Sequence, residues 1–188
     1  MRNRALVLPA LLAGSIGFSN ASEYPKQYFG DWTGVAGVME GDKPEDISVL
    51  IRTESLNPIQ GQKGKKAVYL FFECSERESI TLLISENHLF LPDDRSCSNG
   101  QCIYSQEGSY KLSGEKEKPV QLLSGSETPT AVMLKAPTFK LASKMMSSEY
   151  VSLTFKTFKS APKSEVAKFK TNGFSDAYFW CTQYFANN

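Results

Sequence analysis

Four cysteines constrain the fold of this 188-residue chain more than any other feature. They are Cys74, Cys97, Cys102 and Cys181. In an exported protein an even number of cysteines predicts disulfides, here two, and four cysteines allow three pairings. Only Ser-Asn-Gly-Gln separates Cys97 from Cys102. We therefore expect these two to pair with each other, which leaves Cys74 to pair with Cys181.

The N-terminus indicates export. Arg2 and Arg4 precede the apolar stretch ALVLPALLAGSIGF, and the small residues Ser19, Asn20 and Ala21 follow it. This order is typical of a cleaved secretory signal. The stretch is also shorter than the roughly 20 apolar residues that a membrane-spanning helix needs. We expect cleavage after Ala21, which leaves residues 22–188 as one domain in the periplasm or outside the cell.

The composition of the mature chain excludes some partners. Its 167 residues are enough for one domain with a sizeable core. The signal holds two of the 21 basic residues and none of the 20 acidic ones, so cleavage changes the formal charge from +1 to −1. A nucleic-acid partner would favour a basic face, so we expect none. No further apolar run approaches membrane length, so we expect no membrane segment.

Short segments rich in β-branched and aromatic residues predict a mainly β fold. In residues 151–158, Val151, Leu153 and Phe155 alternate with polar residues, which predicts a strand with one buried face. The segment AVYLFFEC, which ends at Cys74, is apolar on both faces and is expected at the centre of the sheet. Strands are predicted at residues 32–38, 47–53, 67–74, 80–85, 88–91, 102–105, 120–123, 131–135, 151–158 and 166–171.

Two segments show helical periodicity instead. In residues 138–147, apolar residues recur at three- and four-residue steps; they are Phe139, Ala142, Met145 and Met146. The second segment runs from Ser175, a candidate N-cap, to about Phe185. Its predicted buried stripe consists of Ala177, Tyr178, Cys181 and Phe185. Together these elements predict an antiparallel β-sandwich whose C-terminal helix is tied to the sheet by a disulfide. Residues 55–66 are expected to form a flexible surface loop.

Few residues are candidates for catalysis. A single histidine, His88, excludes a site with two histidine ligands, and the C-x4-C spacing without a second close pair disfavours zinc. Asp93 and Asp94 follow a proline, as in a solvated turn. We therefore expect no enzyme activity, no metal and no cofactor. A hydrolase remains an alternative, in which Asp93, Asp94 or Glu76 act as paired carboxylates.

The segment between Asp94 and Cys102 is the candidate binding loop. A covalently closed loop loses little entropy on binding, so its tip is suited to protein recognition. Contacts are then expected from Arg95, Asn99 and Gln101. The purely structural alternative is a bridge that fixes a hairpin with a type I′ turn at Asn99 and Gly100.

A second candidate surface is aromatic. Tyr24, Tyr28, Phe29 and Trp32 lie at the mature N-terminus, where Trp32 is expected to anchor the first strand in the core. Aromatic residues also surround the C-terminal helix so widely that some are expected to face another surface.

Two family resemblances carry further expectations. The motifs Phe29-Gly30-Asp31-Trp32, Ser96-Cys97 to Cys102, and Asn172-Gly173-Phe174-Ser175-Asp176-Ala177 together resemble the invasion-associated locus B family. The segments VYLFFEC and FKTNGFSDAYFWC are similar to periplasmic accessory proteins of type VI secretion, of the VasI or TagO kind. Both resemblances imply an exported β-sandwich with a C-terminal helix and no known catalytic residues.

These observations predict a non-catalytic periplasmic or secreted protein that acts through protein–protein contacts. The resemblances imply a role in host interaction and virulence, or as an accessory to a secretion apparatus. A more specific alternative is an inhibitor that inserts the Cys97–Cys102 loop into the cleft of a host or rival enzyme. A small outer-membrane barrel would also fit the length, but frequent polar interruptions disfavour it.

Overall fold

The computed structural model describes residues 26–38, 47–61, 64–74, 80–85, 90–127, 129–135, 138–157 and 163–187. Structural statements below concern these residues. The predicted signal and three candidates named above lie outside them; these are Tyr24, Glu76 and His88. None of the helices in the described part of the chain has the length and apolar character needed to cross a membrane.

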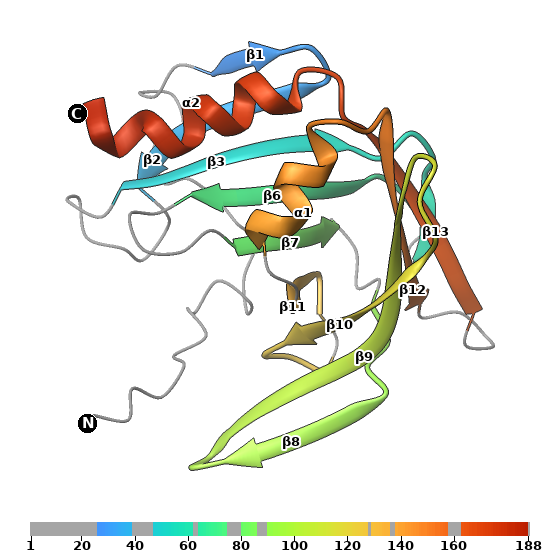
Figure 1. Ribbon diagram of the computed structural model, residues 1–188. Helices are drawn as coiled ribbons and strands as arrows, with labels where there is room; N and C mark the ends of the chain where they lie inside the picture. The colour runs from blue at the N-terminus through green and yellow to red at the C-terminus, as the bar shows by residue number, and fades with distance from the viewer. Residues whose placement is uncertain are drawn as a thin grey trace.

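An antiparallel sheet of 11 strands dominates the protein (Figure 1), as the mainly β prediction requires. Its order is β1-β2-β3-β6-β7-β11-β10-β9-β12-β13, with β8 paired to β9. Its strands are β1 (Gln27–Phe29), β2 (Trp32–Val38), β3 (Ile47–Glu54), β6 (Val68–Cys74), β7 (Ile80–Ser85), β8 (Asp94–Ser98), β9 (Gln101–Leu112), β10 (Lys118–Ser124), β11 (Ala131–Lys135), β12 (Tyr150–Thr157) and β13 (Lys163–Lys170). The remaining elements are the hairpin β4 (Ile59–Gly61) and β5 (Gly64–Lys66), and the helices α1 (Thr138–Met145) and α2 (Phe174–Asn187).

The sheet curves back on itself, so both layers of the predicted sandwich belong to one continuous sheet. In Figure 1, β12 and β13 cross β3, β6 and β7 steeply. The segment after β3 then meets β13: the Leu56 N–H donates to the Lys168 carbonyl at 2.7 Å. The Asn57 side chain extends this pairing, since its amide donates to the Val166 carbonyl at 2.7 Å and accepts from the Lys168 N–H at 3.2 Å.

The core lies on the enclosed face and follows the strand alternation. In β12, Val151, Leu153 and Phe155 are buried, as predicted. The central position of β6 is also confirmed, because it lies between β3 and β7 and is apolar on both faces. Its residue Phe71 packs on the outer face in a second small cluster with Leu50 and Leu82.

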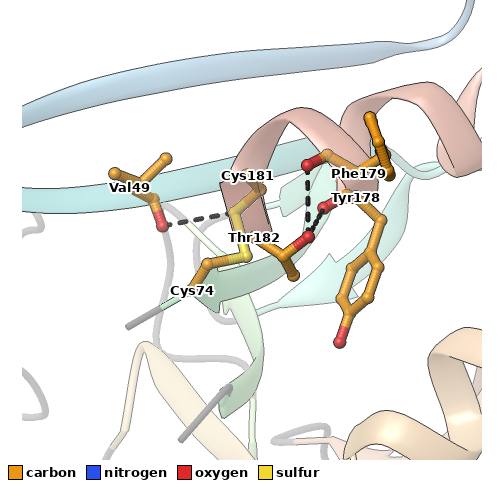
Figure 2. Close-up of a disulfide and its surroundings, with 6 residues drawn as sticks. All are labelled: Val49, Cys74, Tyr178, Phe179, Cys181 and Thr182. Atoms are coloured by element: carbon orange, nitrogen blue, oxygen red, sulfur yellow. Dashed lines mark hydrogen bonds between the residues drawn. A yellow bond between two sulfur atoms is a disulfide. The ribbon is translucent and has the colours of Figure 1, made fainter. Parts of the chain in front are cut away.

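The C-terminal helix α2 packs on the enclosed face, where Ala177, Tyr178 and Cys181 are buried as predicted. Cys181 is bonded to Cys74 at the end of β6, with 5.8 Å between their Cα atoms (Figure 2). The Cys181 sulfur also lies 3.6 Å from the Val49 carbonyl oxygen. The predicted disulfide between sheet and helix is therefore confirmed.

The start of α2 differs from the prediction by one residue. The helix begins at Phe174, and the Gly173 carbonyl accepts the Ala177 N–H at 3.1 Å. Gly173 therefore occupies the N-cap position, and Ser175 lies exposed in the first turn. The general preference for serine at N-caps predicted the wrong residue. The backbone needs a positive φ, 81°, at position 173, and glycine adopts such an angle readily.

The turn before β2 packs against the turn before α2, and we call this contact the terminal clasp (residues 29–32 and 170–174). The Asp31 N–H donates to the Asn172 carbonyl at 3.1 Å, and the Trp32 indole donates to the Lys170 carbonyl at 3.1 Å. The Trp32 ring is fully buried and lies 4.8 Å from the Phe174 ring. The core position predicted for Trp32 is therefore confirmed. Two motifs that carried the family resemblance thus form one contact.

Other segments also differ from the sequence prediction, and three of them are instructive. Helix α1 ends at Met145 and buries Leu141 and Ala142, whereas Phe139 is 74% exposed. The segment predicted as a flexible loop contains the β4–β5 hairpin. The strand predicted at residues 102–105 is only the start of β9, whose later half has too few apolar residues to show a buried face in the sequence.

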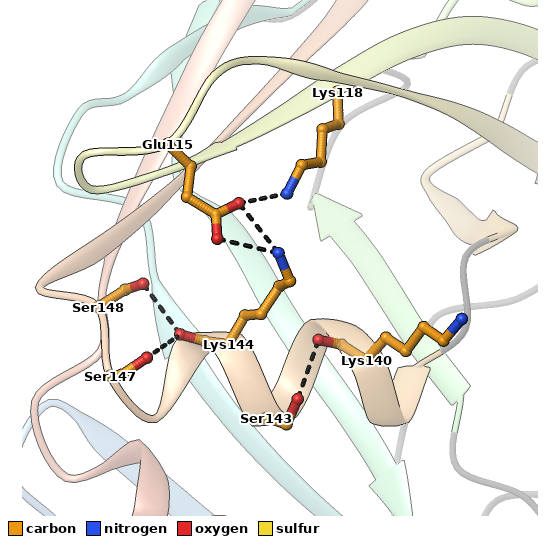
Figure 3. Close-up of polar contacts among 7 residues, drawn as sticks. All are labelled: Glu115, Lys118, Lys140, Ser143, Lys144, Ser147 and Ser148. Carbon is orange, nitrogen blue, oxygen red and sulfur yellow. Dashed lines mark hydrogen bonds and ion pairs between the residues drawn. The ribbon is translucent and has the colours of Figure 1, made fainter.

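An ion-pair cluster connects α1 to the turn between β9 and β10 (Figure 3). The Lys144 ammonium lies 2.9 Å from one Glu115 carboxylate oxygen, and Lys118 pairs with the same carboxylate. Hydrogen bonds from Lys118 first, and then from Lys144, lower the pKa of Glu115 below its ordinary value of 4.5. Because the carboxylate binds protons less readily in the folded state, its contribution to stability is complete above that ordinary value.

We expect this contribution to disappear as the pH falls through the lowered pKa of Glu115. A Glu115→Gln variant should therefore lose a small amount of stability at pH 7 and unfold like the wild type in strong acid. Glu127→Gln, on an exposed turn, is the matched charge control. Urea unfolding between pH 2 and pH 7 measures the difference, and an equal effect of both substitutions at pH 7 would contradict the specific role of Glu115.

Candidate functional site: a disulfide-closed hairpin

Strands β8 and β9 form a tight hairpin. Ser98 is paired with Gln101, and the two residues between them, Asn99 and Gly100, have φ angles of 51° and 78°. Positive φ at both central residues is the requirement of the predicted type I′ turn. Cys97 and Cys102 lie directly opposite each other and are bonded, which confirms the second predicted disulfide.

The tip of this hairpin extends beyond the rest of the sheet (Figure 1). Strand β10 pairs with β9 only as far as Tyr104, so from Ile103 to the turn β8 is the one described strand that pairs with β9. All five residues of β8 are exposed, and Ile103 is 38% exposed. We call residues 94–104 the hairpin arm. Both faces of the arm are open to a partner.

The three predicted contact residues lie on different parts of the arm. Residues directly opposite in an antiparallel pair share a face, and neighbours along a strand alternate. Arg95, opposite Tyr104, therefore lies on the face of the two cysteines, whereas Gln101 lies on the other face and Asn99 in the turn. The predicted set does not form one surface.

Each face of the arm has its own character. On the cystine face, Arg95 is already engaged: its Nε lies 3.1 Å from the Cys97 sulfur and its Nη2 lies 3.2 Å from the Cys102 sulfur. Its guanidinium carbon is also 5.6 Å from the centre of the Tyr104 ring. The opposite face, which we call the Ile103 face, consists of Asp94, Ser96, Ser98, Gln101 and Ile103.

The sequence analysis missed Ile103 and Tyr104 as candidate contact residues. The register of the hairpin could have revealed them, because a two-residue Asn-Gly turn fixes which residues lie opposite each other. In that register, the alternation of side chains along a strand places Ile103 on one face of the arm and Tyr104 on the other.

The two aspartates at the base of the arm have different partners. The Asp93 carboxylate pairs with the Lys156 ammonium at 2.7 Å and accepts the Glu107 N–H at 3.2 Å. The Asp94 carboxylate accepts the Arg95 N–H at 2.8 Å. Asp93, directly before the arm, therefore connects the base of the arm to Glu107 in β9 and to Lys156 in β12. Among the residues that the structure describes, no group of three or more His, Cys, Asp or Glu could hold a metal ion.

The fold and the arm define a class: a mainly β protein with two disulfides and a helix bonded to its sheet. Neither a known family model nor a curated protein matches the chain in sequence. Among solved structures, the chain is similar to invasion associated protein B from Bartonella henselae, with a TM-score of 0.47 and 10% sequence identity over 86% of this chain and 99% of that chain. This likeness is a weak relation between folds.

Proposed function

We propose that this protein is an exported, non-catalytic binding protein that contacts a protein partner through its hairpin arm. The observation that carries the proposal is the exposed, covalently closed arm, open on both faces beyond the sheet. The two disulfides fit an extracellular or periplasmic location. The motif resemblance supports a partner from host interaction or from a secretion apparatus.

The arm is suited to binding because its conformation is already fixed. The disulfide and the Asn99–Gly100 turn limit the freedom of the arm before binding. The arm therefore loses little conformational entropy when a partner binds. The exposed Ile103 side chain supplies apolar area on the face that also carries Gln101. The Ile103 face is the better contact surface, since Arg95 on the other face is engaged with the disulfide.

Site-specific cross-linking tests this proposal. A photo-reactive residue at Gln101 should capture a partner from extracts of the cells that contain the protein, whereas the same residue at Lys116, exposed on the β9–β10 turn, should not. Equal capture from both positions would contradict a role for the arm. If the captured partner is an enzyme that loses activity on binding, the inhibitor alternative is the correct form of the proposal.

Substitution of Ile103 gives the quantitative test. We expect Ile103→Ser to weaken binding of the captured partner about tenfold, the effect of losing about 1.4 kcal/mol at an interface anchor. Val166→Ser is the matched control, because Val166 is an exposed β-branched residue of similar accessibility on β13. An unchanged affinity of the Ile103 variant, with its stability intact, would contradict the assignment of this face.

A further inference from the structure

The disulfide of the hairpin arm has surroundings unlike those of the second disulfide. Cys97 is exposed and Cys102 is partly exposed, whereas Cys74 and Cys181 are 1% and 0% exposed. We propose that Cys97–Cys102 is a thiol-exchange site that reacts with a dithiol reductant, and that Arg95 promotes this reaction. The proposal concerns the arm but does not depend on its role in partner binding.

Access to the sulfur atoms decides which disulfide can react. Thiol–disulfide exchange requires a thiolate to reach a sulfur atom directly, so an exposed disulfide reacts before a buried one. Cys74 and Cys181 lie between β6 and α2, where the folded chain excludes a reductant (Figure 2). The arm offers no comparable protection, because only β8 and β9, among the strands that the structure describes, reach the bonded cysteines.

Arg95 supplies a cation at the reacting sulfurs. Its Nε and Nη2 lie 3.1 Å and 3.2 Å from Cys97 and Cys102. A neutral disulfide sulfur is a weak acceptor, but the thiolate that leaves when the bond breaks accepts a charge-assisted hydrogen bond. Arg95 therefore stabilises the product of the cleavage step more than the disulfide itself.

The arm keeps this cation in place. The Tyr104 ring lies under the guanidinium, and the paired strands place Arg95 on the face of the sulfurs. Asp94, the nearest acidic residue along the chain, lies on the opposite face and accepts the Arg95 backbone N–H. The guanidinium charge is thus directed toward the sulfurs.

The exchange balances in two steps. A thiolate of the reductant attacks the Cys97 sulfur, the more exposed of the pair; a mixed disulfide forms, and Cys102 leaves as a thiolate beside Nη2 of Arg95. The second thiol of the reductant, deprotonated, then attacks its own mixed-disulfide sulfur and releases the Cys97 thiolate. The dithiol is oxidised to a disulfide, and its two electrons reduce Cys97–Cys102.

Mapping the reactive cysteines in the folded protein tests the site. The protein is treated with dithiothreitol, or with glutathione to retain the mixed disulfide, and quenched with N-ethylmaleimide before peptide mass spectrometry. We expect labelling of Cys97 and Cys102 while Cys74–Cys181 stays oxidised, with early glutathione adducts on Cys97. Reduction of both disulfides at the same rate would overturn the proposal.

The role of Arg95 has its own test. We expect Arg95→Gln to slow the exchange about three- to tenfold, and Arg95→Lys to restore part of the rate because it keeps the charge. Arg52→Gln is the matched control: the Arg52 guanidinium also lies over an aromatic ring, 5.3 Å from the centre of the Tyr69 ring, but Arg52 belongs to β3 and not to the arm. An unchanged rate in Arg95→Gln would remove Arg95 from the reaction. Cross-linking at Gln101 measures partner binding separately.

Discussion

A Gly173→Ala substitution is expected to lower the free energy of unfolding by about 2–5 kcal/mol, the sum of backbone strain and overpacking. Gly173 has a φ of 81°, which an alanine adopts only with strain. An added Cβ atom would also lie 1.9 Å from the Phe29 carbonyl oxygen and 2.9 Å from the Gly30 nitrogen. These are backbone atoms of the terminal clasp, so the clasp must open to admit the methyl group.

Gly114→Ala is the matched control for this prediction. Gly114 has a φ of 75°, close to that of Gly173, but nothing lies within 4 Å of its Cβ position. We expect this variant to lose about 1–2 kcal/mol of stability, because only the strain of the left-handed conformation acts on it. Urea unfolding of both variants separates the two effects. Equal losses would show that the clasp accommodates the methyl group and would contradict the close packing described above.

Removal of the Cys74–Cys181 disulfide is expected to have the other large effect. The two residues are 107 positions apart, and in the chain-entropy model a closed loop of about 100 residues stabilises the folded state by about 4.7 kcal/mol. We therefore expect a Cys74→Ala/Cys181→Ala variant to lose about 4–5 kcal/mol. Its unfolding should also depend more steeply on urea, because the unbridged unfolded chain exposes more surface.

The second disulfide provides the control. Cys97 and Cys102 are five positions apart and exposed, so the same model gives about 2 kcal/mol for a Cys97→Ala/Cys102→Ala variant. That variant should retain the core and the dependence on urea of the wild type. If both double variants lost the same stability, the long loop would not be the source of the effect.

Much of the fold could be predicted because the informative patterns are local. Strict alternation placed β12, and the apolar stripe of α2 placed Cys181 on its buried side. The pairing of Cys97 with Cys102 follows from their proximity in sequence. In each case the pattern lies within one short stretch of the chain, and contacts with distant residues do not change the structure that the pattern predicts.

The parts that could not be predicted depend on distant residues. Asn57 supports the meeting of β3 and β13 through its side chain, 109 and 111 positions from its partners. The terminal clasp joins Trp32 to Lys170, 138 positions apart, so each of its motifs alone showed no contact. Phe139 fits the apolar period of α1 but lies outside its buried stripe, because the helix presents Leu141 to the core instead.

The three candidate contact residues do not share one face for a different reason. Arg95, Asn99 and Gln101 were grouped because they are polar neighbours in one short loop. The type I′ turn that the sequence also predicted determines the register, and that register separates Arg95 from Gln101. The information was therefore present in the sequence, and the faces follow once the turn and the alternation are combined.

The terminal clasp also determines the order in which this protein can fold. Its first half, residues 29–32, binds residues 170–174, and α2 and Cys181 come later still. Strands β1, β2 and β3 pair with one another and can do so early, whereas residues 29–32 must wait for residues 170–174. Contacts of such sequence separation form slowly. The clasp therefore closes only when almost the whole chain is present, so the packing of Trp32 against Phe174 is among the last contacts to form.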